Sequence, residues 1–358
     1  MGIKILIYGC DVGGANALGE VIEVLLTNYS PHKAQLRIFS KGLGYKIWKK
    51  SGFPVKKLLE KFNMKKIVEW SDIVFTATSY PADTEISLWM TARGLRKPTV
   101  VLLDFWSNYI ERFTDPTNKR LLWPDKILVM DEMAKKGLID CNAPAEGIEI
   151  TGQPFLERRI KDFGNSRISG ETGSKWFNIM FISQPLHKLP GAKEWGYDEF
   201  KVLDCIIEAL NSLVELNGLK PNLIIRTHPR EDKKDLKVHL NSSDIKFKWS
   251  FDKENNPDKT IAKCQFILGM NSTLLIEAAL ANKTVVSIQP GLVSEDPFPL
   301  SRLGYCRRIG KPDILREFII EKMAKKYQKP AKVLKDFIRG NLNSCKRIVR
   351  MLLSYEKK

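Results

Sequence analysis

The chain has 358 residues, of which 43% are hydrophobic and 28% charged, a globular composition that excludes a disordered or fibrous protein. Lysine and arginine number 58 against 41 aspartates and glutamates, and the net charge of +17 favours an anionic partner: nucleic acid, a phosphorylated ligand or a lipid headgroup. No apolar run approaches the roughly 20 residues of a membrane-spanning helix. Residues 1–10 have the pattern of a buried strand rather than of a signal peptide, so a cytoplasmic protein is expected.

The first half of the chain alternates predicted strands and helices. Ile3–Tyr8 is an apolar run of strand length, followed by a glycine-rich turn and by helical spacing of apolar residues over 15–26. Further strands are predicted at 35–40, 73–78, 99–104, 126–130 and within 147–154, with a helix near 131–138. This order is typical of a Rossmann-like parallel sheet covered by helices on both faces, and we assign residues 1–156 to this domain.

The second half repeats the alternation without repeating the sequence. Residues 157–174 are charged and aperiodic, and they are predicted to be a linker. Strands are then expected at 176–183, 222–227, 266–269 and 284–288, and helices near 200–216 and at 273–281. These elements predict a second α/β domain over residues 175–321, and the chain is long enough for two domains of roughly 150 residues.

Residues 322–358 form a basic tail, with twelve lysines and arginines and two acidic residues. Their apolar positions have helical spacing, which predicts two basic amphipathic helices. Two interpretations are open: the helices pack against the domains and expose their basic faces, or they dock on the anionic inner face of the cell membrane.

Polar residues follow the predicted strands of the second domain, and ligands of parallel sheets bind at such strand ends. His228 follows the strand at 222–227 and could donate a hydrogen bond to a phosphate, or it could simply cap the strand end. Three polar residues lie at the start of the helix predicted at 273–281, where they could bind an anion or only cap the helix: Asn271, Ser272 and Thr273. Glu277 lies one turn further along, where it could reach ribose hydroxyls or face solvent.

The segments HPRE (228–231) and GMNSTLLIEAALANKTVVSIQPG (269–291) resemble the nucleotide-binding half of GT-B glycosyltransferases. The pairing of His-Pro with Ser/Thr is similar to bacterial sialyltransferases, polysialyltransferases and CDP-glycerol glycerophosphotransferases, and Glu277-Ala278 resembles non-hydrolysing UDP-N-acetylglucosamine 2-epimerases. The resemblance covers about residues 126–291. It implies an α/β protein of GT-B fold, with two Rossmann-like domains facing each other across a cleft, and a CMP-, CDP- or UDP-linked sugar donor. It also places Gln184, after the first strand of the second domain, near the donor phosphates.

The first domain supplies candidates for the acceptor side. Its first turn, GCDVGGAN (9–16), is not a GxGxxG fingerprint, but Gly13 and Gly14 permit close approach of a ligand. Asp11 is the first candidate for the base that removes the acceptor proton, or else it organises the glycine turn. Asp104 is the second catalytic candidate of this domain. It is followed by Phe105 and Trp106, which could form a platform for a sugar ring, although core packing of these aromatic rings is the other interpretation.

The resemblance implies a metal-independent inverting glycosyltransferase that uses a carbohydrate or lipid-linked acceptor in surface polysaccharide or glycoconjugate synthesis. The chain has no Asp-x-Asp motif, with which GT-A enzymes hold a divalent ion, and its scattered cysteines and histidines predict no zinc site. Two alternative functions remain open. A nucleotide-sugar 2-epimerase or hydrolase shares the fold, but the arginine-proline-glutamate turn of the epimerases is missing. A basic nucleic-acid-binding protein would fit the charge, but no nucleic-acid-binding motif accompanies it.

Overall fold

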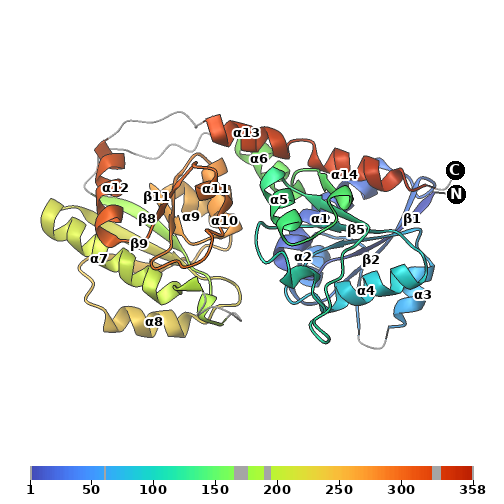
Figure 1. The fold of residues 1–358 in the computed structure, drawn as a ribbon. Coiled ribbons are helices and arrows are strands. Elements are labelled where there is room, and N and C mark those ends of the chain that lie inside the picture. The colour runs from blue at the N-terminus through green and yellow to red at the C-terminus, as the bar shows by residue number, and fades with distance from the viewer. Residues whose placement is uncertain (1, 60–61, 165–175, 189–194, 325–331, 357–358) are drawn as a thin grey trace. The chain divides into compact units, whose positions relative to one another are not determined.

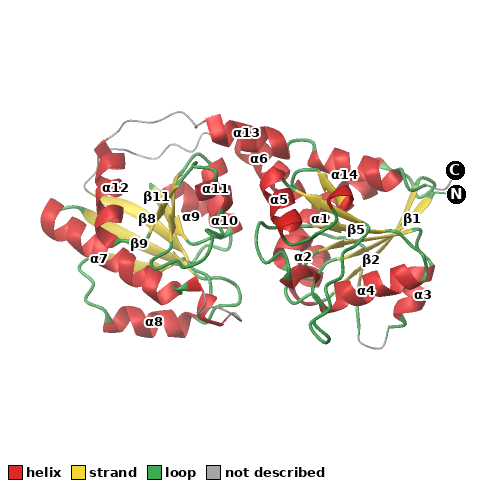
Figure 2. Ribbon diagram, in the orientation of Figure 1, coloured by secondary structure: helices red, strands yellow, loops and turns green. Residues whose placement is uncertain are grey.

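The computed structural model describes residues 2–59, 62–164, 176–188, 195–324 and 332–356 (Figure 1). The chain divides into two compact units, the first formed by Met1–Asp162 with Phe337–Lys358 and the second by Phe163–Asp336. In each unit helices are packed on a parallel sheet (Figure 2). Each unit is therefore a Rossmann-like α/β domain, as the sequence predicts.

The first unit has a seven-stranded sheet with the order β3-β2-β1-β4-β5-β6-β7, in which all described neighbours are parallel. Its strands are β1 (Ile3–Tyr8), β2 (Ala34–Ser40), β3 (Val55–Lys57), β4 (Ile73–Ala77), β5 (Thr99–Leu102), β6 (Lys126–Val129) and β7 (Ile148–Ile150). Its helices are α1 (Val12–Asn28), α2 (Gly42–Lys50), α3 (Met64–Glu69), α4 (Asp83–Gly94), α5 (Glu132–Asp140) and α6 (Pro154–Gly164), with short 3-10 helices at η1 (Glu111–Phe113) and η2 (Ala145–Gly147).

The second unit has a six-stranded parallel sheet with the order β10-β9-β8-β11-β12-β13. Its strands are β8 (Trp176–Ile182), β9 (Lys220–Arg226), β10 (Lys248–Phe251), β11 (Phe266–Gly269), β12 (Thr284–Ile288) and β13 (Arg307–Ile309). Its helices are η3 (Leu186–Lys188), α7 (Glu199–Asn217), α8 (Lys233–Ser242), α9 (Pro257–Lys263), α10 (Thr273–Leu280), α11 (Pro299–Arg302) and α12 (Pro312–Ala324). In both sheets the strand order reverses beside the first strand, at β1/β4 and at β8/β11.

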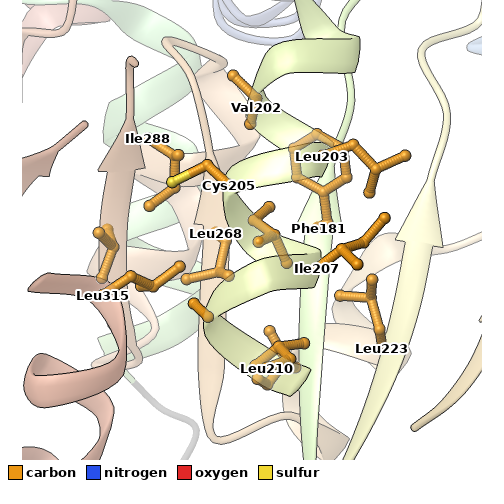
Figure 3. Close-up of a cluster of buried hydrophobic side chains, with 14 of the residues drawn as sticks. Phe181, Val202, Leu203, Cys205, Ile207, Leu210, Leu223, Leu268, Ile288 and Leu315 are labelled. Atoms are coloured by element: carbon orange, nitrogen blue, oxygen red, sulfur yellow. The ribbon is translucent and has the colours of Figure 1, made fainter. Parts of the chain in front are cut away.

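The hydrophobic core of the second unit shows why its residues form these helices and strands. Helix α7 buries apolar residues three or four positions apart, including Val202, Ile206 and Leu210. They pack against apolar side chains of the sheet such as Phe181 and Leu268 (Figure 3). A strand that is buried on both faces has no polar positions, which explains why these segments read as continuous apolar runs.

The basic tail folds back onto the first unit. Helix α13 (Lys332–Asn341) and helix α14 (Ser344–Leu353) are amphipathic, and Ile348, Val349 and Leu352 of α14 are buried in the core of that unit. The tail therefore packs against a domain, as one of the two sequence interpretations holds, and the apolar face of α14 is not exposed for insertion into lipid. Residues 322–324 instead end α12 in the second unit, and residues 325–331 lie outside the described part of the chain.

The predicted linker at 157–174 is wrong in its first part, because α6 continues to Gly164. The charges that hide the helical pattern form ion pairs one turn apart, between Glu157 and Lys161 at 2.7 Å and between Arg158 and Asp162 at 3.2 Å. Pairs at this spacing stabilise a helix. The rest of the predicted linker, residues 165–174, lies outside the described residues.

Glu157 joins α6 to the start of α14. Its carboxylate is 4% exposed and accepts hydrogen bonds from the backbone N–H groups of Asn343 and Cys345, at 3.1 and 2.9 Å, and from the Ser344 hydroxyl at 2.9 Å. It thus serves as the cap of α14, whose own N-cap side chain makes no such bond. Burial works to raise the pKa of Glu157, but these bonds and the Lys161 ammonium hold it below its usual value.

We expect Glu157→Gln to destabilise the protein by about 1–3 kcal/mol at pH 7, since an amide cannot accept all of these bonds. A carboxyl whose pKa is lowered on folding contributes stability above its unfolded pKa of about 4.3, and this is lost as the pH falls through the folded value. The free energy of unfolding, measured with urea, should therefore differ between Glu157→Gln and the unsubstituted protein by less at pH 4 than at pH 7. Glu149→Gln, which removes an exposed pair with Lys126 at 3.9 Å, is the control and should change little.

Candidate functional site

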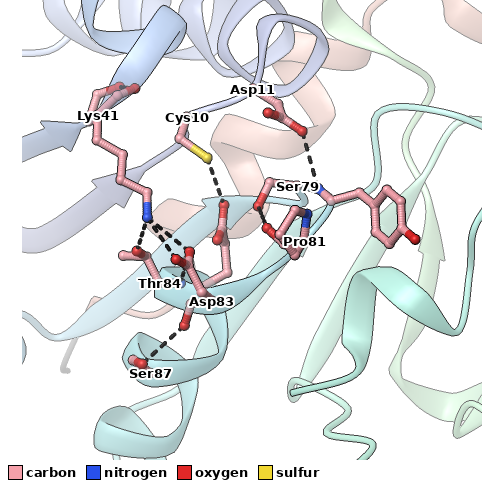
Figure 4. Close-up of polar contacts among 11 residues, drawn as sticks. Cys10, Asp11, Lys41, Ser79, Pro81, Asp83, Thr84 and Ser87 are labelled. Carbon is pink, nitrogen blue, oxygen red and sulfur yellow. Dashed lines mark hydrogen bonds and ion pairs between the residues drawn. The ribbon is translucent and has the colours of Figure 1, made fainter. Parts of the chain in front are cut away.

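Asp11 lies at the switch point of the first sheet, directly after β1 and at the N-cap of α1. Its side chain makes no capping bond to α1; instead, Oδ2 accepts a hydrogen bond of 3.1 Å from the backbone N–H of Tyr80, in the loop after β4 (Figure 4). The carboxylate therefore joins the ends of the two strands between which the order reverses. Asp11 as a whole residue is half-buried.

Asp104 follows β5 on the same edge and is 9% exposed. Its Oδ1 accepts hydrogen bonds from Arg112 Nη1 at 2.7 Å and from the Thr78 hydroxyl at 3.0 Å. The Arg112 guanidinium lies in η1 and is also buried. The arginine compensates the charge of the buried carboxylate, and the ion pair together with the hydroxyl bond fixes the orientation of the Asp104 side chain.

The two glycines of the first turn leave room for protein atoms. A Cβ atom on Gly13 would lie 2.2 Å from Oδ2 of Asp104, and one on Gly14 would lie 2.5 Å from Cβ of Ala77. Internal packing accounts for both glycines, while contact with a ligand stays a prediction. The structure thus brings Asp104 and the Asp11–Gly14 turn together.

The predicted aromatic sugar platform after Asp104 is wrong for Trp106. This side chain is 2% exposed, its Nε1–H donates to Oδ2 of Asp131 at 2.8 Å, and its ring packs 6.0 Å from that of Phe337. Core packing, the other sequence interpretation, is what occurs, because the tail helix α13 covers the indole ring.

The second sheet brings several predicted residues to one edge. Gln184, after β8, accepts a hydrogen bond of 3.1 Å at Oε1 from the backbone N–H of Asn271, after β11. Ser272 is the N-cap of α10, and its hydroxyl accepts the Leu274 N–H at 3.2 Å. The serine hydroxyl is therefore used for capping, and an anion at this helix start would be bound by backbone N–H groups. Thr273 is the first residue of α10.

His228 lies on the same edge, after β9. Its Nδ1 accepts the backbone N–H of Arg230 at 3.1 Å, and its own backbone N–H donates to Oε2 of Glu231 at 3.0 Å. Burial, and secondarily the Arg230 charge, lowers the pKa of His228 to about 4. The ring is therefore neutral near pH 7. Because Nδ1 is an acceptor, the ring proton is assigned to Nε2, which can donate to a ligand oxygen.

Sequence reasoning missed the carboxylates that hold this edge together. Glu231 accepts the Ser183 hydroxyl at 2.6 Å and so joins the ends of β8 and β9. Glu199, 1% exposed at the start of α7, contacts Nδ1 of His187 and accepts its backbone N–H at 3.1 Å. The sequence indicates only that His187 is exposed, but these contacts with Glu199 fix it at this edge of the second sheet. A buried glutamate cannot be recognised from the residues next to it in the sequence. A glutamate that lies close to a predicted strand end can still be taken as a candidate site residue.

Glu277 is 8% exposed and lies within α10, so it does not face solvent as one sequence interpretation proposed. Contact of Glu277 with a ribose stays a prediction. Among the described residues, no group of three or more histidine, cysteine, aspartate or glutamate side chains could hold a metal ion. Nor does any described helix combine the length and apolar character that crossing a bilayer requires.

Comparisons with known proteins assign the fold. No protein-family model matches the chain, and no curated protein matches it. Among solved structures, UDP-GlcNAc 2-epimerase from Methanocaldococcus jannaschii is similar over 98% of this chain and 99% of its own, with 15% identity and a TM-score of 0.66. MnaA from S. aureus, solved with UDP, matches over 99% and 97% of the two chains, with 15% identity and a TM-score of 0.65.

MurG from Acinetobacter baumannii is similar over 99% of this chain and all of its own, with 11% identity and a TM-score of 0.54. The glycotransferase of kitacinnamycin is also similar, with a TM-score of 0.56, so an epimerase and a glycotransferase share this architecture with the chain. The protein has the GT-B fold, which confirms the fold that the His-Pro and Ser/Thr segments predict.

The contact between Gly13 and Asp104 can be tested with a matched pair of variants. We expect Gly13→Ala to destabilise the protein by about 1–3 kcal/mol, because the added methyl displaces the buried carboxylate from Arg112. Gly19→Ala, on the same helix, meets its nearest atom at 3.5 Å and should instead stabilise by about 0.5–1 kcal/mol through helix propensity. Urea unfolding midpoints measure both. Equal effects of the two substitutions would contradict the close approach of Asp104 to the turn.

Proposed function

We propose that the protein acts on a nucleotide-activated sugar and that it is a metal-independent inverting glycosyltransferase. The observation that carries the proposal is the neutral His228, whose Nε2–H can donate to a phosphate oxygen at the same edge of the sheet as the start of α10. A helix N-terminus and neutral donors bind phosphate without a cation, since backbone N–H groups and the helix dipole both favour negative charge. Asn271 and Thr273 lie at that start, and Gln184 holds the loop through the Asn271 N–H.

On the acceptor side, the contacts separate the roles of the two aspartates. Asp104 is held by Arg112 and Thr78, so we assign it to positioning the glycine turn. Asp11 is half-buried and is assigned as the base. The acceptor oxygen attacks the anomeric carbon while its proton passes to the Asp11 carboxylate, and the bond from that carbon to the phosphate oxygen breaks with its electron pair going to the phosphate. A carbohydrate or lipid-linked acceptor is the proposed partner, as in surface polysaccharide or glycoconjugate synthesis.

A nucleotide-sugar 2-epimerase or hydrolase is the second candidate. One observation favours it: the similar UDP-GlcNAc 2-epimerase structures have TM-scores of 0.61 to 0.66, against 0.54 for MurG and 0.56 for the kitacinnamycin glycotransferase. The first turn argues the other way, because it reads GCDVGGAN and lacks the arginine-proline-glutamate sequence expected of an epimerase. No contact of the described residues favours a nucleic-acid-binding protein.

Nucleotide binding can be tested by thermal shift with CMP, CDP, UDP and GDP. We expect a cytidine or uridine nucleotide to stabilise the protein, by about 2.7 kcal/mol when it is present at 100 times its dissociation constant. His228→Ala should abolish the shift. His239→Ala is the matched control, because this histidine lies on α8, pairs with Asp204 of α7 at 2.6 Å and should leave the shift unchanged. No shift with any nucleotide would overturn both enzyme proposals.

A second experiment separates the two reactions. The protein is incubated in D2O with the UDP- or CMP-sugar that binds, without an acceptor. Inversion at C2 requires the C2–H bond to break, so an epimerase places deuterium at C2 of the nucleotide sugar. We expect no deuterium at C2 and only slow release of free nucleotide and sugar, as for a transferase without its acceptor. Rapid deuterium incorporation that His228→Ala suppresses would favour the epimerase instead.

A further inference from the structure

The positive charge of the chain is concentrated in one segment of the first unit. Residues 29–68 contain eleven lysines and arginines and one acidic residue, a net charge of +10, whereas the whole chain carries +17. The segment includes β2, α2, β3 and most of α3, and β3 is the edge strand of the sheet. More than half of the excess charge of the protein therefore belongs to the elements at this side of one sheet.

The lysines beside the edge strand are exposed and have few acidic partners. Lys56 and Lys57 of β3 are exposed, as are Lys65 and Lys66 of α3. Among the described residues, only Lys65 of these four makes an ion pair, with Glu69 at 3.9 Å, and exposed pairs of this kind contribute little. The ammonium groups therefore present a positive potential to the solvent.

Two apolar side chains are exposed between these lysines. Leu59 is 56% exposed and Phe62 is 38% exposed. The backbone N–H of Phe62 donates to the carbonyl group of Leu59 at 3.1 Å, and the Phe62 ring packs edge-on against that of Phe39 in β2, with 5.9 Å between the ring centroids. Water disfavours such exposure, and transfer of these side chains into an apolar medium is favourable. Together these residues form a surface that we call the basic edge: Lys56, Lys57, Leu59, Phe62, Lys65 and Lys66.

The basic edge is joined to the turn of the proposed base by hydrogen bonds. The backbone N–H of Leu58, after β3, donates at 2.8 Å to the carbonyl group of Ser40, the last residue of β2. The buried Ser40 hydroxyl donates at 2.6 Å to the carbonyl group of Gly9, two residues before Asp11. The segment after β3 is thus connected, through the end of one strand, to the loops at which the acceptor is proposed to bind.

We propose that the basic edge docks on an anionic lipid bilayer. Leu59 and Phe62 enter the boundary between headgroups and acyl chains, while the lysines contact the anionic headgroups. The inference rests on the proposed function in one respect: a lipid-linked acceptor lies in the same bilayer, and docking brings it to the unit that contains Asp11.

The apolar residues favour lipid over nucleic acid as the partner. Proteins that bind single strands stack bases on aromatic rings, and leucine has no such face. The tail helix α14 provides a contrast, because Lys346 and Arg350 are exposed but none of its described apolar residues is. This helix packs on the face of the sheet opposite to α3 (Figure 1). It is therefore a basic surface without exposed apolar groups, and it supplies a matched control.

Docking can be measured by sedimentation of the full chain with phosphatidylcholine vesicles that contain or lack phosphatidylglycerol. We expect binding only to the anionic vesicles. The binding should fall as salt is raised, because the Debye length decreases from about 10 Å at 0.1 M to about 3 Å at 1 M. Lys57→Glu combined with Lys66→Glu should weaken partitioning by about 30-fold, since each lysine near an anionic surface contributes about fivefold.

The control is Lys346→Glu combined with Arg350→Glu on α14, which makes the same change in net charge and should weaken partitioning far less. Urea unfolding midpoints verify that both double variants are folded. Equal losses in the two variants, equal binding to both kinds of vesicle, or no binding to either would overturn the proposal.

A second pair of variants tests the apolar contact. Leu59→Asn keeps the charge and should weaken partitioning by about fivefold, because part of a leucine side chain no longer leaves water. Leu216→Asn, at a position 68% exposed on α7 of the second unit, is the control and should have no effect. If Leu59→Asn leaves vesicle binding unchanged and the lysine variant weakens binding of polyuridine, the edge binds nucleic acid instead. These readouts use no nucleotide sugar, so failure of docking leaves the proposed reaction standing, and failure of the nucleotide screen leaves docking standing.

Discussion

Each unit depends on one constraint: a parallel sheet brings the carboxyl ends of all its strands to the same edge. The loops at that edge contain polar side chains and backbone groups that the sheet does not pair. These groups must find other hydrogen-bond partners there. Where the strand order reverses, two loops separate toward opposite faces, and a side chain from one bonds the backbone of the other. Asp11 does this with Tyr80 in the first unit, and Gln184 with Asn271 in the second. The same structural requirement thus arises twice and is met by different residues.

The candidate residues differ in how their charge is compensated, and this separates fixed groups from groups that can change state. Asp104 accepts hydrogen bonds from Arg112 and Thr78, so its position is fixed. Glu85 has only hydrogen-bond donors and a neighbouring anion, so burial favours its neutral form. His228 is the same case for a base: burial, and secondarily the Arg230 charge, disfavours the imidazolium, and the ring is neutral. The neighbouring charges and hydrogen bonds of a group, rather than its residue type, therefore determine whether it can exchange a proton near neutral pH.

The sequence predicts the central strands and several site residues, for a physical reason. Strands with helices on both faces are continuous apolar runs, as in β4, where all five residues are buried. The outer strands β3, β10 and β13 contain exposed polar residues and were not predicted, because their pattern is that of loops. Residues directly after strands, such as His228 and Asn271, could be found from their position alone. The burial of Glu85 and Trp106 could not, since it depends on elements distant in the chain.

The two buried glutamates of the first unit show how the environment decides what an identical side chain does. Glu157 meets three donors and the Lys161 ammonium, and its pKa is below the usual value. Glu85 meets a weakly donating thiol and its pKa is about 7. The first arrangement stabilises the junction of α6 and α14 at neutral pH. The second costs stability once the carboxylate forms, and such a cost is typical of groups kept for a reaction rather than for folding. This asymmetry is the physical reason to look for function beside Asp11.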